Sequence, residues 1–156
     1  MENIKYTKKD GVDFLGNISD LSQFNESSID EIYTSHTLEH VSQKNMESTL
    51  SGIYRVLKPG GLFLVSVPHL DVLCHIFISP VASLQIKFQI MRMRFGVQED
   101  NFDFHYFGWS RELMTDYLVK AGFSDIHRVE SFGFFDDFGN YRPFGIYISL
   151  NMIASK

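Results

Sequence analysis

One apolar segment near the middle of the chain constrains the fold more than any other feature. Residues 62–67 (LFLVSV) are almost entirely apolar, and they follow Pro59, Gly60 and Gly61, residue types that end helices and form turns. A strand that is apolar on both faces is typical of a parallel sheet, because crossover helices cover both of its faces. The run therefore predicts a buried strand inside an α/β domain.

The segments before this run alternate between strand and helix patterns. Residues 13–18 are expected to form a short strand that runs into a turn, and residues 31–35 form a stronger one. Ser42 is a suitable N-cap for the helix that follows. One face of this helix has apolar residues at helical spacing, and we expect that face to be buried against the sheet: Met46, Leu50, Ile53 and Leu57.

Residues 71–95 carry two apolar stripes in a helical pattern. One stripe consists of Leu84, Phe88, Met91 and Phe95, and the other consists of Ile86, Ile90 and Met93. A helix that is apolar on two sides suits core packing or a dimer contact, a lid over a substrate, or a membrane surface. Core packing or a dimer contact is the interpretation that we prefer.

The last part of the chain is predicted to contain a helix and two strands. The helix spans residues 110–121, with Gly122 as its C-cap and with Leu113, Tyr117, Leu118 and Ala121 on one face. Residues 126–132 and 144–153 read as strands, and the turn-rich residues between them suit an antiparallel hairpin. The sequence thus predicts an α/β fold with a mostly parallel sheet, a C-terminal antiparallel hairpin and helices on both faces.

Composition narrows the possible functions. The formal net charge of −5 argues against general nucleic-acid binding, which needs a basic surface. No window is long and apolar enough to span a bilayer, the N-terminus does not resemble a secretory signal, and the single Cys74 cannot form an internal disulfide. We expect a cytoplasmic protein with one domain over residues 1–156.

Residues 36–40 (HTLEH) match the H-x-x-E-H pattern of inverted zinc peptidases. Two histidines at this spacing ligate zinc when they share a helical face. Here the pattern begins at the end of a predicted strand, and nothing marks Glu99 or Glu130 as a third ligand. We therefore expect no metal site, and we expect His36 and His40 not to share a common centre. Glu39 would instead favour a helix start, and His40 would form a loop hydrogen bond.

Three segments carry a resemblance to a known family. They are residues 16–32 (GNISDL through NESSIDEI), residues 33–41 (YTSHTLEHV) and residues 55–68 (RVLKPGG leading into LFLVSVP). Residues 105–123 add a late helix that ends in AGF. In this order and spacing, residues 12–135 resemble the type 11 group of class I (Rossmann-like) S-adenosylmethionine-dependent methyltransferases.

The resemblance implies where S-adenosylmethionine would bind. Asn17 and Ile18 stand at positions that lie near the adenine in the family, which usually has Asp in place of Asn17. Asn17 is equally compatible with an Asx turn. The segment under the methionine part of the cofactor corresponds to Ser35, His36, Thr37 and Leu38. All these residues follow predicted strands, and ligands of open parallel sheets bind beyond the carboxyl ends of strands.

The sequence lacks one central motif of the family. There the first strand ends in a GxGxG loop, which lets the backbone approach the cofactor, whereas the 11 glycines of this chain include no GxG. Lys5 also stands near the position where the family's second strand ends in an acidic residue. We therefore expect an N-terminally truncated domain, either a fragment of a longer protein or a natural remnant, whose cofactor binding is doubtful.

His69 and His105 are the candidates for substrate-side catalysis. A base that removes a proton from the methyl acceptor assists transfer to oxygen or nitrogen, and histidine titrates in a suitable range. His69 follows the strand that ends at Pro68, and His105 precedes the late helix in a cluster with Asp103, Tyr106 and Trp109. Both histidines are also compatible with ordinary hydrogen bonding in loops.

The resemblance implies methyl transfer from S-adenosylmethionine to an acceptor that the sequence does not identify. The alternative is a non-catalytic scaffold or oligomerisation module that kept the sheet and lost the cofactor. In the family the first strand lies beside the strand that ends at Ser35, so a missing first strand would expose an edge that invites pairing. We therefore expect a homodimer.

Overall fold

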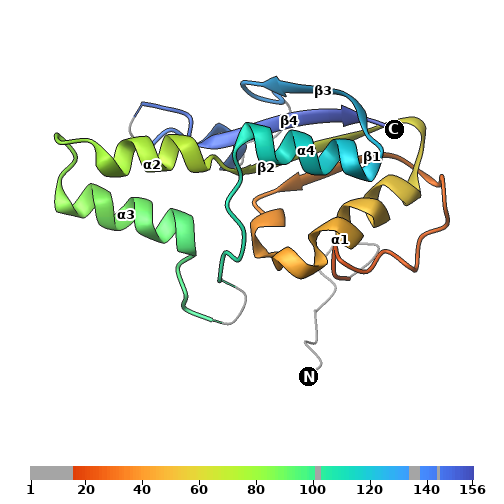
Figure 1. Ribbon diagram of the computed structural model, residues 1–156, viewed down its shortest axis with the longest axis horizontal. Coiled ribbons are helices and arrows are strands. Elements are labelled where there is room, and N and C mark those ends of the chain that lie inside the picture. Colours follow the sequence, from red (N-terminus) through yellow and green to blue (C-terminus); the bar gives the residue numbers. More distant parts are fainter. Residues whose placement is uncertain (1–15, 101–102, 134–137, 144) are drawn as a thin grey trace.

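The computed structural model describes residues 16–100, 103–133, 138–143 and 145–156 (Figure 1). Its helices and strands, in chain order, are β1 (Ile29–Ser35), η1 (Leu38–His40), α1 (Gln43–Val56), β2 (Leu57–Pro68), α2 (Leu70–Ile78), α3 (Leu84–Phe95), α4 (Arg111–Ala121), β3 (Ser124–Val129), η2 (Phe138–Asn140) and β4 (Ser149–Ser155).

The described strands form one four-stranded sheet in the order β1-β2-β4-β3. β1 and β2 are parallel neighbours, whereas β4 runs antiparallel to both β2 and β3. β1, β2 and β3 therefore point in one direction, and β4 lies between two of them in the other. This mixed sheet confirms the predicted fold class, including the antiparallel pair at the C-terminal end of the sequence.

The apolar run of residues 62–67 lies in the centre of the sheet, as predicted. Phe63, Leu64, Val65 and Val67 are buried, and β2 pairs with a strand on each side. The residues before the run do not form the expected turn after a helix. α1 ends at Val56, and β2 begins at once with Leu57, which pairs with Ile29. Because the register resumes only at Leu62, Pro59, Gly60 and Gly61 form an irregularity inside the strand.

The main core lies between one face of the sheet and the helices α1 and α4. The predicted face of α1 is confirmed, since Met46, Leu50, Ile53 and Leu57 are fully buried. Ser110 is the N-cap of α4, and its side chain accepts a hydrogen bond from the Leu113 amide; Gly122, with φ 103, is the C-cap. The predicted face of α4 was wrong in part. Met114 is buried there, whereas Leu113 is exposed.

Residues 71–95 form two helices, α2 and α3, rather than one. The chain turns between them in a segment that contains Pro80, which cannot continue a helix. The two helices lie side by side beyond the end of the sheet (Figure 1). The stripe with Ile86, Ile90 and Met93 packs toward α2 in a second, smaller core. The other stripe faces solvent, and Leu84, Phe88, Met91 and Phe95 are exposed.

Among the described residues, the opposite face of the sheet is contacted by only one short helix. Asn151 of β4 donates a hydrogen bond to the Gly139 carbonyl of η2 and another to the Glu130 carbonyl. Helices therefore contact both faces of the sheet, but on this second face the contact comes from the single turn η2. None of the described helices has the length and apolar character needed to cross a membrane.

The remaining strand boundaries differ from the prediction. Residues 16–18 form part of a turn, and residues 13–15, like the candidate strand at residues 2–6, lie outside the described residues. β3 begins earlier than expected and ends at Val129, whereas β4 begins only at Ser149 and leaves Ile146 exposed. Propensity alone does not determine these ends, because pairing with β2 selects which residues of β4 join the sheet.

Candidate functional site

A cavity of about 640 Å³ lies at the carboxyl ends of the parallel strands β1 and β2. Ser35 and Pro68, the last residues of these strands, contribute to its wall. The η1 turn contributes Glu39 and His40, and the segment after α3 contributes Gly96, Asp103 and His105. This is the edge of an open sheet at which ligands bind.

His36 connects the end of β1 to this cavity through a strained backbone. Its φ of 47 lies in the left-handed region, which is unusual for a residue with a side chain. Its amide donates to the Ser66 carbonyl at 2.8 Å, and its Nε2 lies 2.9 Å from Ser149 Oγ. Nδ1 lies 3.4 Å from Glu39 Oε1. The turn thus holds the imidazole between β4 and η1.

Glu39 carries a buried carboxyl group. The residue is 1% exposed, and neither side-chain oxygen accepts a hydrogen bond from any described residue. Burial therefore raises the pKa of Glu39 to about 8. Its backbone carbonyl accepts hydrogen bonds from the amides of Tyr106 at 2.8 Å and Phe107 at 3.2 Å. These two bonds hold the segment that carries His105 against η1.

His40 and His105 meet at this junction. Their rings are perpendicular, with centroids 4.6 Å apart. His40 Nδ1 donates a hydrogen bond to the Phe104 carbonyl at 3.1 Å, which confirms the expected loop hydrogen bond. Burial, together with the neighbouring His40, lowers the pKa of His105 to about 4. One ligand atom from each of Glu39, His40 and His105 lies within 4.8 Å of the other two. His36 is not in this group.

His69, the other predicted catalytic residue, lies apart from the wall of the cavity. It is 6% exposed and precedes α2, and its Nε2 lies 3.5 Å from Asp71 Oδ2. Its backbone forms a bridge with that of Trp109. Burial lowers the pKa of His69, with a further contribution from the positive charge of Arg128. The structure therefore brings His105, but not His69, to the cavity.

Of the residues predicted to bind the cofactor, some line the cavity and others do not. Ser35 and His36 line the cavity. Thr37 donates its hydroxyl hydrogen bond to the Ser35 carbonyl at 3.1 Å, and Leu38 is fully buried in the core. Asn17 is exposed, and its Oδ1 accepts a hydrogen bond from the Ser19 amide at 2.9 Å, which is an Asx turn. Ile18 packs against the main core.

A row of polar side chains crosses the sheet next to the cavity. Ser35, Ser66 and Asn151 are register partners on β1, β2 and β4. The two serine hydroxyls and the Asn151 Oδ1 are buried and have no hydrogen-bond partner among the described residues. Buried polar atoms are normally paired, and of these three residues only Ser35 belongs to the cavity wall. The sequence signal for this row was the single serine in LFLVSV.

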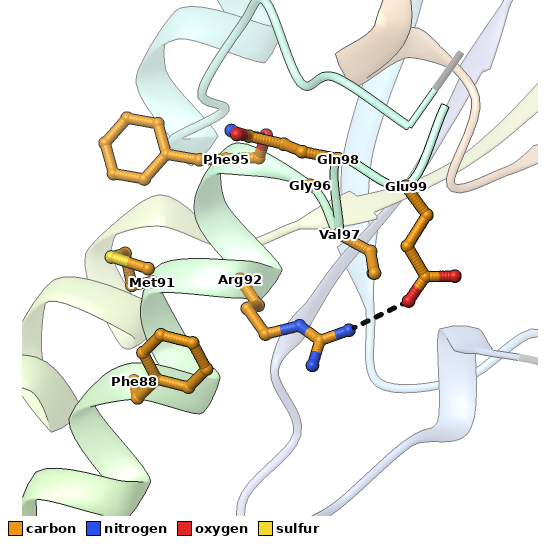
Figure 2. Close-up of a pocket in the computed structure, with 8 residues that line it drawn as sticks. All are labelled: Phe88, Met91, Arg92, Phe95, Gly96, Val97, Gln98 and Glu99. Carbon is orange, nitrogen blue, oxygen red and sulfur yellow. Dashed lines mark hydrogen bonds and ion pairs between the residues drawn. The ribbon is translucent and has the colours of Figure 1, made fainter. Parts of the chain in front are cut away.

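A second hollow, of about 480 Å³, lies at the end of α3 and shares Arg92, Gly96 and Val97 with the first cavity. Figure 2 shows Arg92 reaching toward Glu99, with 3.6 Å between Nη2 and Oε1, while Phe88, Met91 and Phe95 of the same helix also line the hollow. Its wall contains no histidine, cysteine or hydroxyl group among the described residues. We therefore place the candidate site in the cavity with the histidines.

Comparisons with known proteins bear on the sequence family and the fold of the chain. Residues 2–65 match the family model described as a methyltransferase domain. No curated protein sequence matches the chain.

Several solved structures share the fold at low sequence identity. A possible histamine N-methyltransferase from Thermotoga maritima is 17% identical, with a TM-score of 0.55, over 90% of this chain and 62% of that one. A methyltransferase from Archaeoglobus fulgidus is 17% identical, with a TM-score of 0.54, over 89% and 64%. A 1,6-didemethyltoxoflavin-N1-methyltransferase from Burkholderia thailandensis, with bound S-adenosylhomocysteine, is 19% identical, with a TM-score of 0.53, over 89% and 48%.

These likenesses show the fold rather than the activity. The chain spans between 48% and 64% of the length of these three structures. Residues 2–65 are thus similar to a methyltransferase domain, and the fold of the chain is similar to that of S-adenosylmethionine-dependent methyltransferases.

Proposed function

We propose that this chain takes part in methyl transfer from S-adenosylmethionine to an oxygen or nitrogen acceptor, at the cavity beyond β1 and β2. The observation that carries the proposal is the position of Ser35 and His36. These residues stand where the family holds the methionine part of the cofactor, and both line the cavity. In methyl transfer, a lone pair of the acceptor displaces the methyl group from the sulfonium, and S-adenosylhomocysteine leaves.

In this proposal the described residues mainly bind the cofactor and position it relative to the methyl acceptor. Ser35, on the cavity wall, offers its hydroxyl to the cofactor, and Thr37 and Leu38 shape the turn beneath it. Asn17 and Ile18 would lie toward the adenine. His105, on the cavity wall, is the candidate that takes a proton from the acceptor, because a neutral imidazole has a free lone pair. His69 is a weaker candidate, since it is buried away from that wall.

The alternative is a non-catalytic scaffold, and the absence of any GxG from the sequence favours it. Without that loop, the backbone contacts that the family uses to bind the cofactor are reduced. We propose that residues 1–156 form a single domain. We also propose that this chain alone binds the cofactor weakly. Its expected cytoplasmic location also stays a prediction.

Calorimetric titration with S-adenosylhomocysteine tests this proposal. We expect saturable binding with a Kd weaker than about 100 µM, which corresponds to about 5.5 kcal/mol or less. Ser35→Leu should weaken binding, because the larger side chain intrudes on the part of the cavity next to the end of β1. Ser51→Leu, on the exposed side of α1, should leave binding unchanged. A Kd in the micromolar range would contradict the proposal that the chain binds the cofactor weakly. No binding at millimolar S-adenosylhomocysteine would favour the non-catalytic scaffold.

We also propose that the chain forms a homodimer. β1 is one of the two edge strands of the described sheet, and the outer stripe of α3 exposes Leu84, Phe88 and Phe95. Exposed apolar patches of this kind are typical of protein contacts. Size-exclusion chromatography with light scattering should give about twice 18.0 kDa.

Two substitutions test which surface forms the dimer. Phe88→Glu should give a monomer, because it places a charge in the outer stripe of α3. Val119→Glu is the matched control, since Val119 is exposed to a similar degree on α4 (58% against 55%), and it should leave the dimer intact. A wild-type chain that elutes as a monomer of 18.0 kDa would contradict the proposal.

A further inference from the structure

We propose that Glu39, His40 and His105 form a binding site for a divalent metal ion, with zinc as the expected ion. Each of these residues has one ligand atom within 4.8 Å of those of the other two. Two imidazoles and one carboxylate form a ligand set that zinc accepts in proteins, and zinc sites with three protein ligands keep a fourth position open. Magnesium and calcium, by contrast, prefer oxygen ligands.

The hydrogen bonds of the two histidines leave one nitrogen of each ring free for a metal. His40 Nδ1 lies 3.1 Å from the Phe104 carbonyl, which can only accept, so this nitrogen carries the proton and Nε2 keeps its lone pair. The backbone carbonyls of Met93 and Arg94 likewise accept from the His105 ring. Its Nδ1 is buried and has no partner among the described residues. Metal-bound histidines commonly donate their second ring N–H to a carbonyl in this way.

Glu39 supplies a second, independent observation. Glu39 is only 1% exposed, and the two oxygens of its carboxyl group accept no hydrogen bond within the described part of the chain. Burying a carboxylate without donors is costly, and proteins compensate for it by protonation, with a paired charge or with a metal ion. Within the described part of the chain, His36 Nδ1 lies 3.4 Å from Glu39 Oε1 and is charged only when it is protonated. A cation between Glu39 and the two imidazoles would provide that compensation.

The backbone already holds the three residues together. Glu39 and His40 are neighbours in η1, and the Glu39 carbonyl accepts hydrogen bonds from Tyr106 and Phe107, next to His105. Two ligands of a tetrahedral zinc ion lie about 3.4 Å apart. Binding therefore needs only side-chain rotations that bring the three ligand atoms closer than their present limit of 4.8 Å. All three residues line the cavity, so the open position would face it.

This site differs from the one that the HTLEH pattern suggested. His36 does not belong to the group, and its Nε2 lies 2.9 Å from Ser149 Oγ. The third ligand, His105, comes from a segment far along the sequence, which is why sequence spacing led us to expect no metal. The inference does not rest on methyl transfer. His105 cannot act as a free base while it holds an ion, so metal binding also decides between its two roles.

Calorimetric titration of the untagged chain with Zn²⁺, after removal of bound metal with a chelator, tests the site. We expect one ion per chain. Titration with Co²⁺ should give the visible absorption of a four-coordinate nitrogen and oxygen site. His40→Ala and His105→Ala should each weaken Zn²⁺ binding at least tenfold. His127→Ala removes an exposed histidine of β3 outside the group, and it should leave binding unchanged.

Glu39→Gln keeps the shape of the side chain and provides a second measurement that does not depend on truncating a ring. It should also weaken binding at least tenfold, and circular dichroism would verify that each variant is folded. The proposal is overturned if the folded wild-type chain binds no Zn²⁺. It is equally overturned if folded His40→Ala and His105→Ala chains bind Zn²⁺ as the wild type does.

Discussion

Leu50→Ala is expected to lower the free energy of unfolding by about 2–5 kcal/mol, the range found when a buried leucine is truncated. Leu50 is fully buried in α1, and it belongs to the core between α1, α4 and the sheet. Truncation removes apolar surface from this core and leaves a cavity that close-packed neighbours fill only in part. Chemical denaturation followed by circular dichroism measures the difference.

The chain contains a matched control for this substitution. Leu84 is the same residue type at the start of α3, but it is 85% exposed. Leu84→Ala should therefore change stability by less than about 0.5 kcal/mol, as is usual for surface positions. Equal losses in the two variants would mean that α1 is not packed on the sheet as described.

Gly96→Ala is expected to have the second large effect, a loss of at least about 2 kcal/mol together with displacement of the segment that carries His105. Gly96 has φ +84, a conformation that costs other residues about 1–3 kcal/mol. A Cβ at this position would also lie 1.5 Å from the Asp103 carbonyl oxygen and 3.3 Å from the His105 ring. The backbone of residues 103–105 would have to move, since overpacking of this kind adds further strain.

Gly60→Ala separates the effect of backbone strain from the effect of the steric clash. Gly60 has a similar φ of +76, but a Cβ there meets no described atom within 4 Å. It should cost only the backbone strain, about 1 kcal/mol. Denaturation curves measure the stability of both variants, and the chemical shifts of the His105 ring report its displacement. An unchanged His105 signal in Gly96→Ala would show that the Asp103 carbonyl has room to retreat without it.

The sequence predicted those parts of the fold that depend on local pattern. The helical spacing of Met46, Leu50 and Ile53 determined the buried face of α1, and the apolar run determined the central strand β2. The Ser110 cap and Gly122 determined both ends of α4. Each of these features depends on residues that lie within a few positions of one another in the sequence.

Features that depend on distant partners were not predictable in this way. Met114 is buried in place of Leu113 because of how α4 faces α1, which no residue of α4 specifies alone. In the candidate site, Ser35 and His36 were identified from the family resemblance, and they line the cavity. The approach of His105 to Glu39 was not foreseen, because it depends on backbone hydrogen bonds between η1 and a segment far along the chain.

The position of β4 has a consequence for how the chain folds. β4 is the last strand in the sequence, yet it lies between β2 and β3 and is the only described strand that joins them. During synthesis, β3 therefore emerges from the ribosome with no described strand to pair with, and it waits until β4 has followed. Closing the long loop between β2 and β4 costs chain entropy before any pairing is gained, which slows folding. Until then the apolar edge of β2 is open to pairing with other chains.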